Sequence, residues 1–141
     1  MVGHNAVAEP SGIQLPGRKI GRGQPCFIIA EAGVNHNGRE ELAFQLVDIA
    51  AAAGADAIKF QTFRAESLAT RSARMARYQI ENIGIEESQH DMLRKLELSR
   101  AAHQRLIEYS AQKGILFLSS PFDEGSADFL VKIGVPLLKI P

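Results

Sequence analysis

The sequence has one cysteine, no tryptophan, no excess of either charge and no long apolar run. The single cysteine, Cys26, excludes a disulfide within the chain, and because it opens an apolar run we expect its thiol to be buried. Sixteen basic side chains balance sixteen acidic ones, and no basic cluster suggests a nucleic-acid or anionic-membrane surface. No run approaches the roughly 20 apolar residues of a membrane span, and the polar N-terminus lacks a signal-peptide core. These absences favour a cytoplasmic protein without nucleic-acid or membrane partners, and they leave room for a local site that binds a small anion.

The chain also lacks the glycine-rich motifs of nucleotide-binding proteins. Residues 31–38 (EAGVNHNG), which follow the first apolar run, contain neither G-x-G-x-x-G nor a P-loop lysine. A length of 141 residues with 45% hydrophobic side chains is typical of one globular domain. We expect residues 1–10 to form a flexible extension and residues 11–141 to form the folded part.

Segments with strand and helix patterns alternate along the folded part. Residues 13–20 predict a hairpin around Pro16-Gly17, because proline presets φ and glycine accepts the positive φ that follows. Core strands are predicted at residues 25–30, 57–61, 115–120 and 135–140. Helices are predicted at residues 39–53, with Leu42, Leu46 and Ile49 as an apolar stripe, at 99–113, and after Asp123. This alternation predicts a parallel α/β protein, either an open doubly wound sheet or part of a (β/α)8 barrel.

The connection from residue 62 to residue 98 is unusually long, and long loops after strands often carry function. Its arginines could screen an anionic substrate or could form a solvated charged face; they are Arg64, Arg71, Arg74 and Arg77. Ser88 and Asp91 resemble a capping box at the start of a short helix within it. His90 and His103 fall on predicted helices, where we expect solvent exposure. None of the four histidines has the spacing of a metal-binding pair.

Polar side chains stand at or just beyond the carboxyl end of each predicted strand, which is where barrel enzymes place their chemistry. Taken singly, each has a structural explanation: a lysine can be a solvated strand end, and a serine can cap a turn. His36 is expected to form a hydrogen bond within its Asn-His-Asn-Gly turn. The candidate site residues are Glu31, Asn35, Lys59, Gln61, Ser120 and Lys139.

Several ordered blocks extend over nearly the whole chain after Ile13, and together they resemble the N-terminal half of the sialic acid synthase (N-acetylneuraminate synthase) family. The blocks are residues 29–38 (IAEAGVNHNG), 58–62 (IKFQT), 87–98 (ESQHDMLRKLEL), 118–122 (LSSPF) and 138–140 (LKI). Members of that family join phosphoenolpyruvate to an N-acylated aldose in a (β/α)8 barrel that precedes a small antifreeze-like domain. Related members make legionaminic or pseudaminic acid. The resemblance therefore implies an α/β fold in which this chain is the N-terminal half of a TIM barrel, with about four parallel strands.

The resemblance also implies roles for the candidate residues. Lys59, Ser120 and Lys139 match positions that contact phosphoenolpyruvate, and Ser120 keeps the hydroxyl where some members have threonine. Gln61 matches a contact to the sugar. Glu31 is the candidate catalytic carboxylate, which orients the sugar or manages a proton, while Asn35 shapes the first loop.

The resemblance further implies a divalent metal, manganese or magnesium, whose ligands lie outside this chain, and a homodimeric intact parent. A closed (β/α)8 barrel needs about 250 residues, so we expect the chain to be a fragment or a truncated product that is inactive alone. Two alternatives stay open. One is a non-catalytic half-barrel that binds a phosphorylated ligand or a partner chain. The other is a phosphoenolpyruvate-dependent aldol synthase of the 3-deoxy-octulosonate phosphate type, which the 87–98 block disfavours.

Overall fold

The structure is a computed structural model that describes residues 12–69 and 88–141. The predicted flexible extension at residues 1–10 and the arginines at positions 71, 74 and 77 lie outside the described residues. Within the described residues, no helix is both long and apolar enough to cross a membrane.

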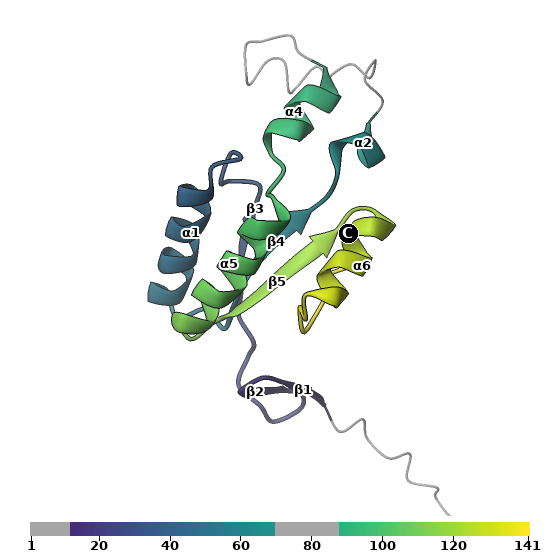
Figure 1. The fold of residues 1–141 in the computed structure, drawn as a ribbon. Helices are drawn as coiled ribbons and strands as arrows, with labels where there is room; N and C mark the ends of the chain where they lie inside the picture. The colour runs from purple at the N-terminus through teal and green to yellow at the C-terminus, as the bar shows by residue number, and fades with distance from the viewer. Residues whose placement is uncertain (1–11, 70–87) are drawn as a thin grey trace, which may run out of the picture.

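The first described element is the predicted hairpin. Strands β1 (Ile13–Leu15) and β2 (Arg18–Ile20) are antiparallel and pair Leu15 with Arg18, and Gly17 takes φ +69° in the turn between them. Arg18 forms an ion pair with Asp56 at 3.0 Å and donates to the carbonyl oxygen of Cys26 at 3.2 Å. These contacts hold the hairpin at the end of the sheet where the parallel strands begin (Figure 1).

Three parallel strands form the sheet in the order β3 (Ile29–Gly33), β4 (Ala57–Thr62) and β5 (Leu116–Pro121). Helix α1 (Glu40–Ala52) connects β3 to β4, α5 (Arg100–Gln112) precedes β5, and α6 (Glu124–Lys132) follows it. The short helices α2 (Ala65–Leu68) and α4 (Gln89–Lys95) lie beyond the carboxyl end of β4 (Figure 1). Strands that are neighbours in sequence are neighbours in the sheet, as in a (β/α)8 barrel, whereas a doubly wound sheet reverses its strand order.

Local side-chain chemistry sets the helix ends. The Ser99 hydroxyl accepts a hydrogen bond from the Ala102 N–H at 3.0 Å, and the Asp123 carboxylate accepts one from the Ser126 N–H at 2.8 Å. Ser88 caps α4 in the same way, through the Asp91 N–H at 3.0 Å. These contacts confirm the three helix starts that the sequence predicts.

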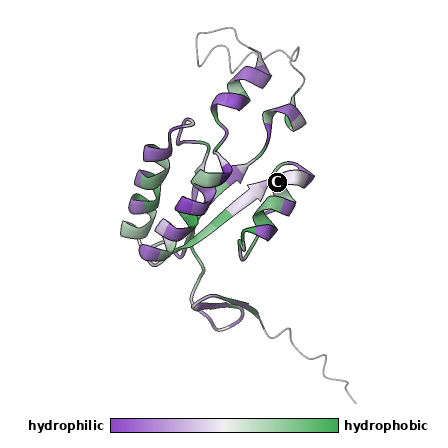
Figure 2. Cartoon of the chain, in the orientation of Figure 1, coloured by the Kyte–Doolittle hydropathy of each residue, from purple (hydrophilic) through white to green (hydrophobic). Residues whose placement is uncertain are grey.

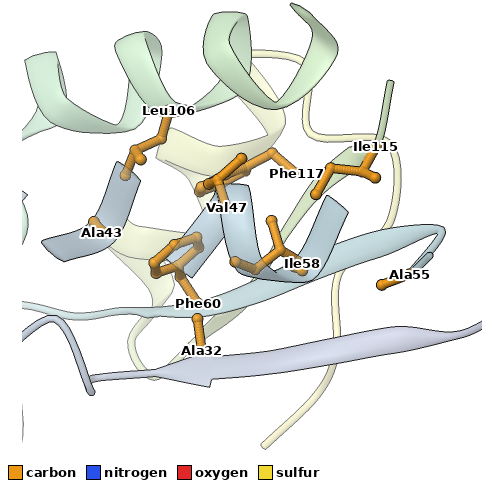
Figure 3. Packing of buried hydrophobic residues seen from close by; sticks show 10 residues of the cluster. Ala32, Ala43, Val47, Ala55, Ile58, Phe60, Leu106, Ile115 and Phe117 are labelled. Atoms are coloured by element: carbon orange, nitrogen blue, oxygen red, sulfur yellow. The ribbon is translucent and has the colours of Figure 1, made fainter. Parts of the chain in front are cut away.

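The hydrophobic core lies between one face of the sheet and the helices (Figure 3). Phe60 and Phe117 stack with ring centroids 5.4 Å apart, and Leu106 of α5 and Val47 of α1 pack in the same cluster. Figure 2 shows β5 apolar along its first part and paler toward its end, where serines replace the apolar side chains. The opposite face of the sheet carries Leu118 beside Lys59 and, nearer the strand ends, Ser120 beside Gln61.

The predicted stripe on α1 lies at the edge of the buried face: Leu46 packs against the core, Leu42 is half-buried and Ile49 is exposed. Its buried residues are Ala43, Val47 and Ala50, whereas Ile49 is 65% exposed. Small side chains let α1 approach the large aromatic side chains of the sheet, so the bulkier leucines are displaced to the flank.

The first predicted strand begins later than expected. Strand β3 starts at Ile29, and Cys26 is exposed rather than buried. Ile28 is 50% and Ile29 41% exposed, because β3 is an edge strand and no further strand pairs with it among the described residues.

The predicted fourth strand is also not formed. Residues 135–140 make only an isolated parallel bridge between Ser119 and Leu138, supported by a hydrogen bond from the Lys139 N–H to the Ser119 carbonyl at 3.3 Å. The described sheet therefore has three strands rather than about four. Residues 135–140 lie beside β5, where a fourth strand would be.

Candidate active site

Four of the six candidate residues share one face of the sheet. The strand register pairs Glu31 with Lys59, and Gln61 with Ser120. Because side chains alternate along a strand, these positions face away from Phe60 and from the helix-covered core. The carboxyl ends of three adjoining strands thus present a carboxylate, an ammonium, an amide and a hydroxyl on a single surface.

Lys59 and Glu31 form an ion pair at the centre of this surface. The Lys59 side chain is only 13% exposed, while that of Glu31 is 53% exposed. Lysine is rarely buried without a partner, and this carboxylate compensates its charge. Glu31 therefore holds the ammonium in place and at the same time remains accessible to a solute.

A β-bulge in β3 creates this geometry. The register shifts between Glu31 and Gly33, so that Glu31 stays opposite Lys59 while Ala32 enters the core. Gly33 takes φ +54°, and a Cβ atom there would lie 3.4 Å from Glu31 Oε1 and 3.7 Å from Gln61 Nε2. The glycine backbone thus passes directly beside two of the polar groups of the site.

Ser120 is 2% exposed, and its hydroxyl has no hydrogen-bond partner among the described residues. A buried polar group without a partner costs about 1–3 kcal/mol, so each such group needs an explanation. On a surface that also carries an ammonium, a phosphate oxygen is a suitable acceptor for this hydroxyl.

The remaining two candidates, Asn35 and Lys139, are both exposed. The Asn35 N–H donates to the Ala32 carbonyl at 3.0 Å, which places this residue in the turn directly after the bulge. The Lys139 N–H lies against β5 through its bond to Ser119. The structure thus puts both residues next to the site strands, but neither side chain joins the Glu31–Lys59 pair.

His36 forms the predicted hydrogen bond within its turn, because its Nδ1 accepts from the Gly38 N–H at 3.0 Å. The imidazole is fully buried and its ring centroid lies 6.0 Å from that of Phe60. Burial, with a smaller contribution from nearby His103, lowers the pKa of His36 below its ordinary value of 6.5. The ring is therefore the neutral Nε2–H tautomer, and this second nitrogen has no partner among the described residues.

A second buried polar group lies on the helix side of the sheet, and sequence reasoning missed it. His103, expected to be exposed, is 2% exposed and its Nδ1–H donates to the Ser99 carbonyl at 2.9 Å. Its Nε2 then accepts from the Thr62 hydroxyl at 2.8 Å, which in turn lies 2.7 Å from the Ser119 hydroxyl. Burial lowers the pKa of His103. The signal was available: strand alternation directs Thr62 and Ser119 toward the helices, where their hydroxyls need a polar partner.

His90, also expected to be exposed, is 3% exposed on α4. Helix α4 packs against α2, which covers part of its surface. The prediction that His90 and His103 are exposed was therefore wrong for both residues.

Two cavities among the described residues lie away from the polar surface. The larger one, of about 530 Å³, lies at the opposite end of the strands and is lined by the hairpin, Phe27 and Val135 among others. A cavity of about 410 Å³ lies beside His103 and the start of α6 on the helix side. We assign the site from its polar groups and strand geometry, because an open surface between strand ends need not form an enclosed cavity.

No group of three or more His, Cys, Asp or Glu side chains that could hold a metal ion occurs within residues 12–69 and 88–141. The Glu31 carboxylate is engaged by the Lys59 ammonium. The described residues thus do not by themselves fit a metal site.

Consecutive parallel strands with helices on one face and polar side chains at the strand ends on the other define a segment of a (β/α)8-barrel enzyme. The chain belongs to the NeuB family, whose family model matches residues 46–141. This membership confirms the family that the sequence blocks indicate.

Several of the relatives are named as sugar-acid synthases, for legionaminic acid, pseudaminic acid or N-acetylneuraminate 9-phosphate. The N,N'-diacetyllegionaminic acid synthase of Legionella pneumophila is 50% identical over 121 residues, covering 86% of this chain and 34% of the relative. The N-acetylneuraminate-9-phosphate synthase of Homo sapiens is 36% identical over 126 residues, covering 89% and 34%. The chain spans about a third of the length of these curated relatives.

A solved structure gives the same fold. The N-acetylneuraminic acid (sialic acid) synthetase of Leptospira borgpetersenii, in complex with citrate, matches with a TM-score of 0.73 and 38% identity. The match covers 91% of this chain and 40% of that protein. It confirms the α/β fold of the N-terminal part of a TIM barrel over the open doubly wound alternative.

Proposed function

We propose that this chain forms the N-terminal barrel portion of a synthase that condenses phosphoenolpyruvate with an N-acylated aldose, giving a nonulosonic acid and phosphate. The observation that carries the proposal is the single surface formed by the Glu31–Lys59 pair, Gln61 and the unpartnered Ser120 hydroxyl. It offers groups for an anion and for a polyol side by side. The names of the relatives support this reaction class.

Lys59 and Ser120 bind the phosphate and carboxylate of phosphoenolpyruvate, with Lys139 approaching from the segment beside β5. The Gln61 amide donates to and accepts from the hydroxyl or acyl group of the sugar. Glu31 orients the sugar or moves a proton, and Asn35 shapes the loop at the edge of the site. When the phosphate takes over the Lys59 ammonium, the Glu31 carboxylate is released toward the sugar, so binding of the first substrate prepares the site for the second.

The bond changes follow from the substrates. C3 of phosphoenolpyruvate attacks the aldehyde carbon, the new carbon–carbon bond forms, and the aldehyde oxygen takes up a proton. Water adds at C2 of the former phosphoenolpyruvate, and the resulting tetrahedral centre expels phosphate to leave a 2-keto acid. The Lys59 ammonium stabilises charge on the phosphate throughout.

A divalent cation, manganese or magnesium, is part of the proposed reaction, in which it would polarise the aldehyde oxygen. We assign none of its ligands to this chain, since the described residues do not fit a metal site. The proposed parent is a homodimer, as the family resemblance implies. The proposed cytoplasmic location rests on the single cysteine and on the polar N-terminus without a signal-peptide core.

The sugar proposed is a diacetamido hexose. Two relatives named N,N'-diacetyllegionaminic acid synthase are 50% and 48% identical to the chain, against 36% for the human N-acetylneuraminate-9-phosphate synthase and 35% for a pseudaminic acid synthase. A nine-carbon acid built from three-carbon phosphoenolpyruvate requires a six-carbon partner, and two acetyl groups on the product require two on that partner.

The test uses a full-length synthase that carries this chain as its N-terminal third, called the parent synthase below. We expect phosphate release from phosphoenolpyruvate only when manganese or magnesium and an acylated aldose are both present, and faster with a diacetamido hexose than with N-acetylmannosamine. Phosphate release that ignores the sugar would contradict the condensation. A preference for arabinose 5-phosphate would favour the octulosonate phosphate alternative.

The exposed start of β3 supports a second candidate function. Ile28 and Ile29 present apolar side chains beside a strand edge that no other described strand pairs with, which suits a half-barrel that pairs with a separate chain. Sedimentation of the purified 141-residue chain with the separately expressed remainder of a family member separates the two functions. Stable association of the two separate chains would support it, and no association at micromolar concentrations would count against it.

A further inference from the structure

His36 is the buried side chain of the loop that follows the site strand β3, and the proposed site does not use it. The loop runs as successive tight turns, with hydrogen bonds from Asn37 N–H to the Val34 carbonyl at 2.9 Å and from Arg39 N–H to the His36 carbonyl at 2.9 Å. Asn37 takes φ +50° and Gly38 takes φ +72°, conformations that the loop must be held in. The bond from the Gly38 N–H to His36 Nδ1 closes this segment on itself.

The loop is fixed from two sides. On the core side, the His36 ring lies against Phe60, the β4 residue between Lys59 and Gln61. On the outer side, Gly38 lies against the end of α4 so closely that a Cβ atom there would be 1.9 Å from the Lys95 carbonyl oxygen. His36 thus joins the turn after β3 to the back of the strand that carries the site lysine.

The polar atoms of His36 matter beyond its volume. An apolar side chain of similar size would fill the space behind Phe60 without leaving the Nε2–H unpartnered. Only a side chain with an acceptor at the place of Nδ1 can also satisfy the Gly38 N–H. A histidine at this position therefore holds the 34–38 loop through Nδ1, although its Nε2–H has no partner among the described residues.

We propose that His36 is a positioning residue for the site: its Nδ1 acceptor holds the 34–38 loop and, through the bulge at Gly33, keeps Glu31 opposite Lys59. This inference rests on the proposed function. The His36 side chain acts through the loop and through Phe60, and it does not itself contact a substrate.

The test compares two variants in the parent synthase. His36→Leu fills the space and removes the acceptor, whereas His36→Asn places an amide oxygen near the position of Nδ1. We expect His36→Leu to lower kcat by about tenfold or more, and His36→Asn to recover at least about half of that loss on a logarithmic scale. The melting temperature need not follow this order, because leucine packs better than asparagine.

His103→Leu is the matched control, since it removes a second buried histidine that lies outside the loop. We expect it to lower the melting temperature while kcat stays within about threefold of the parent synthase. Unchanged kcat in His36→Leu, or losses in both His36 variants that simply track their melting temperatures, would overturn the positioning role. An unmodified parent synthase that releases no phosphate would instead overturn the proposed function.

Discussion

At the scale of single residues, Lys59 and Ser120 differ in what they contact before any substrate arrives. Lys59 has its charge compensated by Glu31, whereas the buried Ser120 hydroxyl has no partner within residues 12–69 and 88–141. One substrate must therefore displace an existing ion pair at the first position and supply a missing hydrogen bond at the second. The two residues respond differently to replacement.

Lys59→Ala should lower kcat/KM for phosphoenolpyruvate in the parent synthase by about 100-fold or more. The change removes the cation that binds the phosphate and leaves the Glu31 carboxylate to repel it. Steady-state phosphate release measures the loss, and Lys132→Ala on α6 is the control for removing a lysine elsewhere.

The double variant Lys59→Ala with Glu31→Gln separates these two causes. Removing the repelling carboxylate should lower the KM for phosphoenolpyruvate relative to Lys59→Ala alone, even though kcat falls further. A Lys59→Ala enzyme within about threefold of the parent would rule out the phosphate contact.

Ser120→Ala should leave the free energy of unfolding unchanged or raise it by about 1 kcal/mol, because it removes a buried hydroxyl that no described residue contacts by a hydrogen bond. In the same variant the KM for phosphoenolpyruvate should rise by about tenfold, since the phosphate loses a donor. Urea unfolding and steady-state kinetics measure the two effects.

Ser119→Ala is the neighbouring control. Its hydroxyl lies 2.7 Å from that of Thr62, so the variant should lose about 1 kcal/mol of stability and leave the KM unchanged. If Ser120→Ala destabilised as Ser119→Ala does, the Ser120 hydroxyl would have a structural partner and the phosphate contact would be in doubt.

At the scale of elements, His103 joins α5 to β4 and β5 through Ser99, Thr62 and Ser119.

Strand alternation predicts from the sequence that Lys59 and Gln61 share a face. It could also have predicted a polar partner behind the sheet, but nothing local identifies which helix residue supplies it. Helix periodicity placed the α1 stripe on Leu42 and Ile49, because it weighs side-chain size and not the room that Phe60 leaves. The prediction of a fourth strand was wrong because a strand needs a series of backbone pairings, and residues 135–140 make only one bridge to β5. The apolar pattern of the segment does not carry that information.

Two buried histidines make stability depend on pH in a known direction. Burial lowers the pKa of both His36 and His103 below the ordinary 6.5, so the unfolded chain takes up their protons first as the pH falls. Their contribution is fully present above pH 6.5 and is lost progressively below it, down to the folded pKa values, at no more than about 1.4 kcal/mol per pH unit for each histidine.

Urea unfolding between about pH 7.5 and 5 measures this slope, before the carboxylates begin to titrate. His103→Gln should reduce the slope by the contribution of one proton, although it also lowers stability at neutral pH. A stability that did not change between pH 6.5 and 5 would show that neither ring is held neutral.

At the scale of the whole molecule, three strands cannot close a barrel, and the described site is one wall of a binding surface. Sequence blocks identified this portion of the fold correctly, because family motifs lie at strand ends whose order the barrel fixes. Four of the six candidate residues lie on one face of the sheet, because strand register and alternation bring them together.

The purified 141-residue chain should therefore show little or no phosphate release from phosphoenolpyruvate, with or without sugar and metal, when compared with the parent synthase. Its site lacks the opposite wall that would exclude water and hold the second substrate. Turnover by the isolated chain at more than about a hundredth of the parent rate would overturn the view that further strands are essential.

Alternation along β4 separates two kinds of mutational outcome within six residues. Ile58 and Phe60 are buried against the helices, while Lys59 and Gln61 face the site, so neighbouring codons serve unrelated requirements. A saturation library of residues 58–61 should divide by parity, with even positions giving unfolded proteins and odd positions giving folded proteins of altered activity. Ala57, an odd position, is fully buried and should behave like the even ones. A substitution at Gln61, the proposed sugar contact, can therefore change which sugar is accepted while the core side chains Ile58 and Phe60 stay as they are.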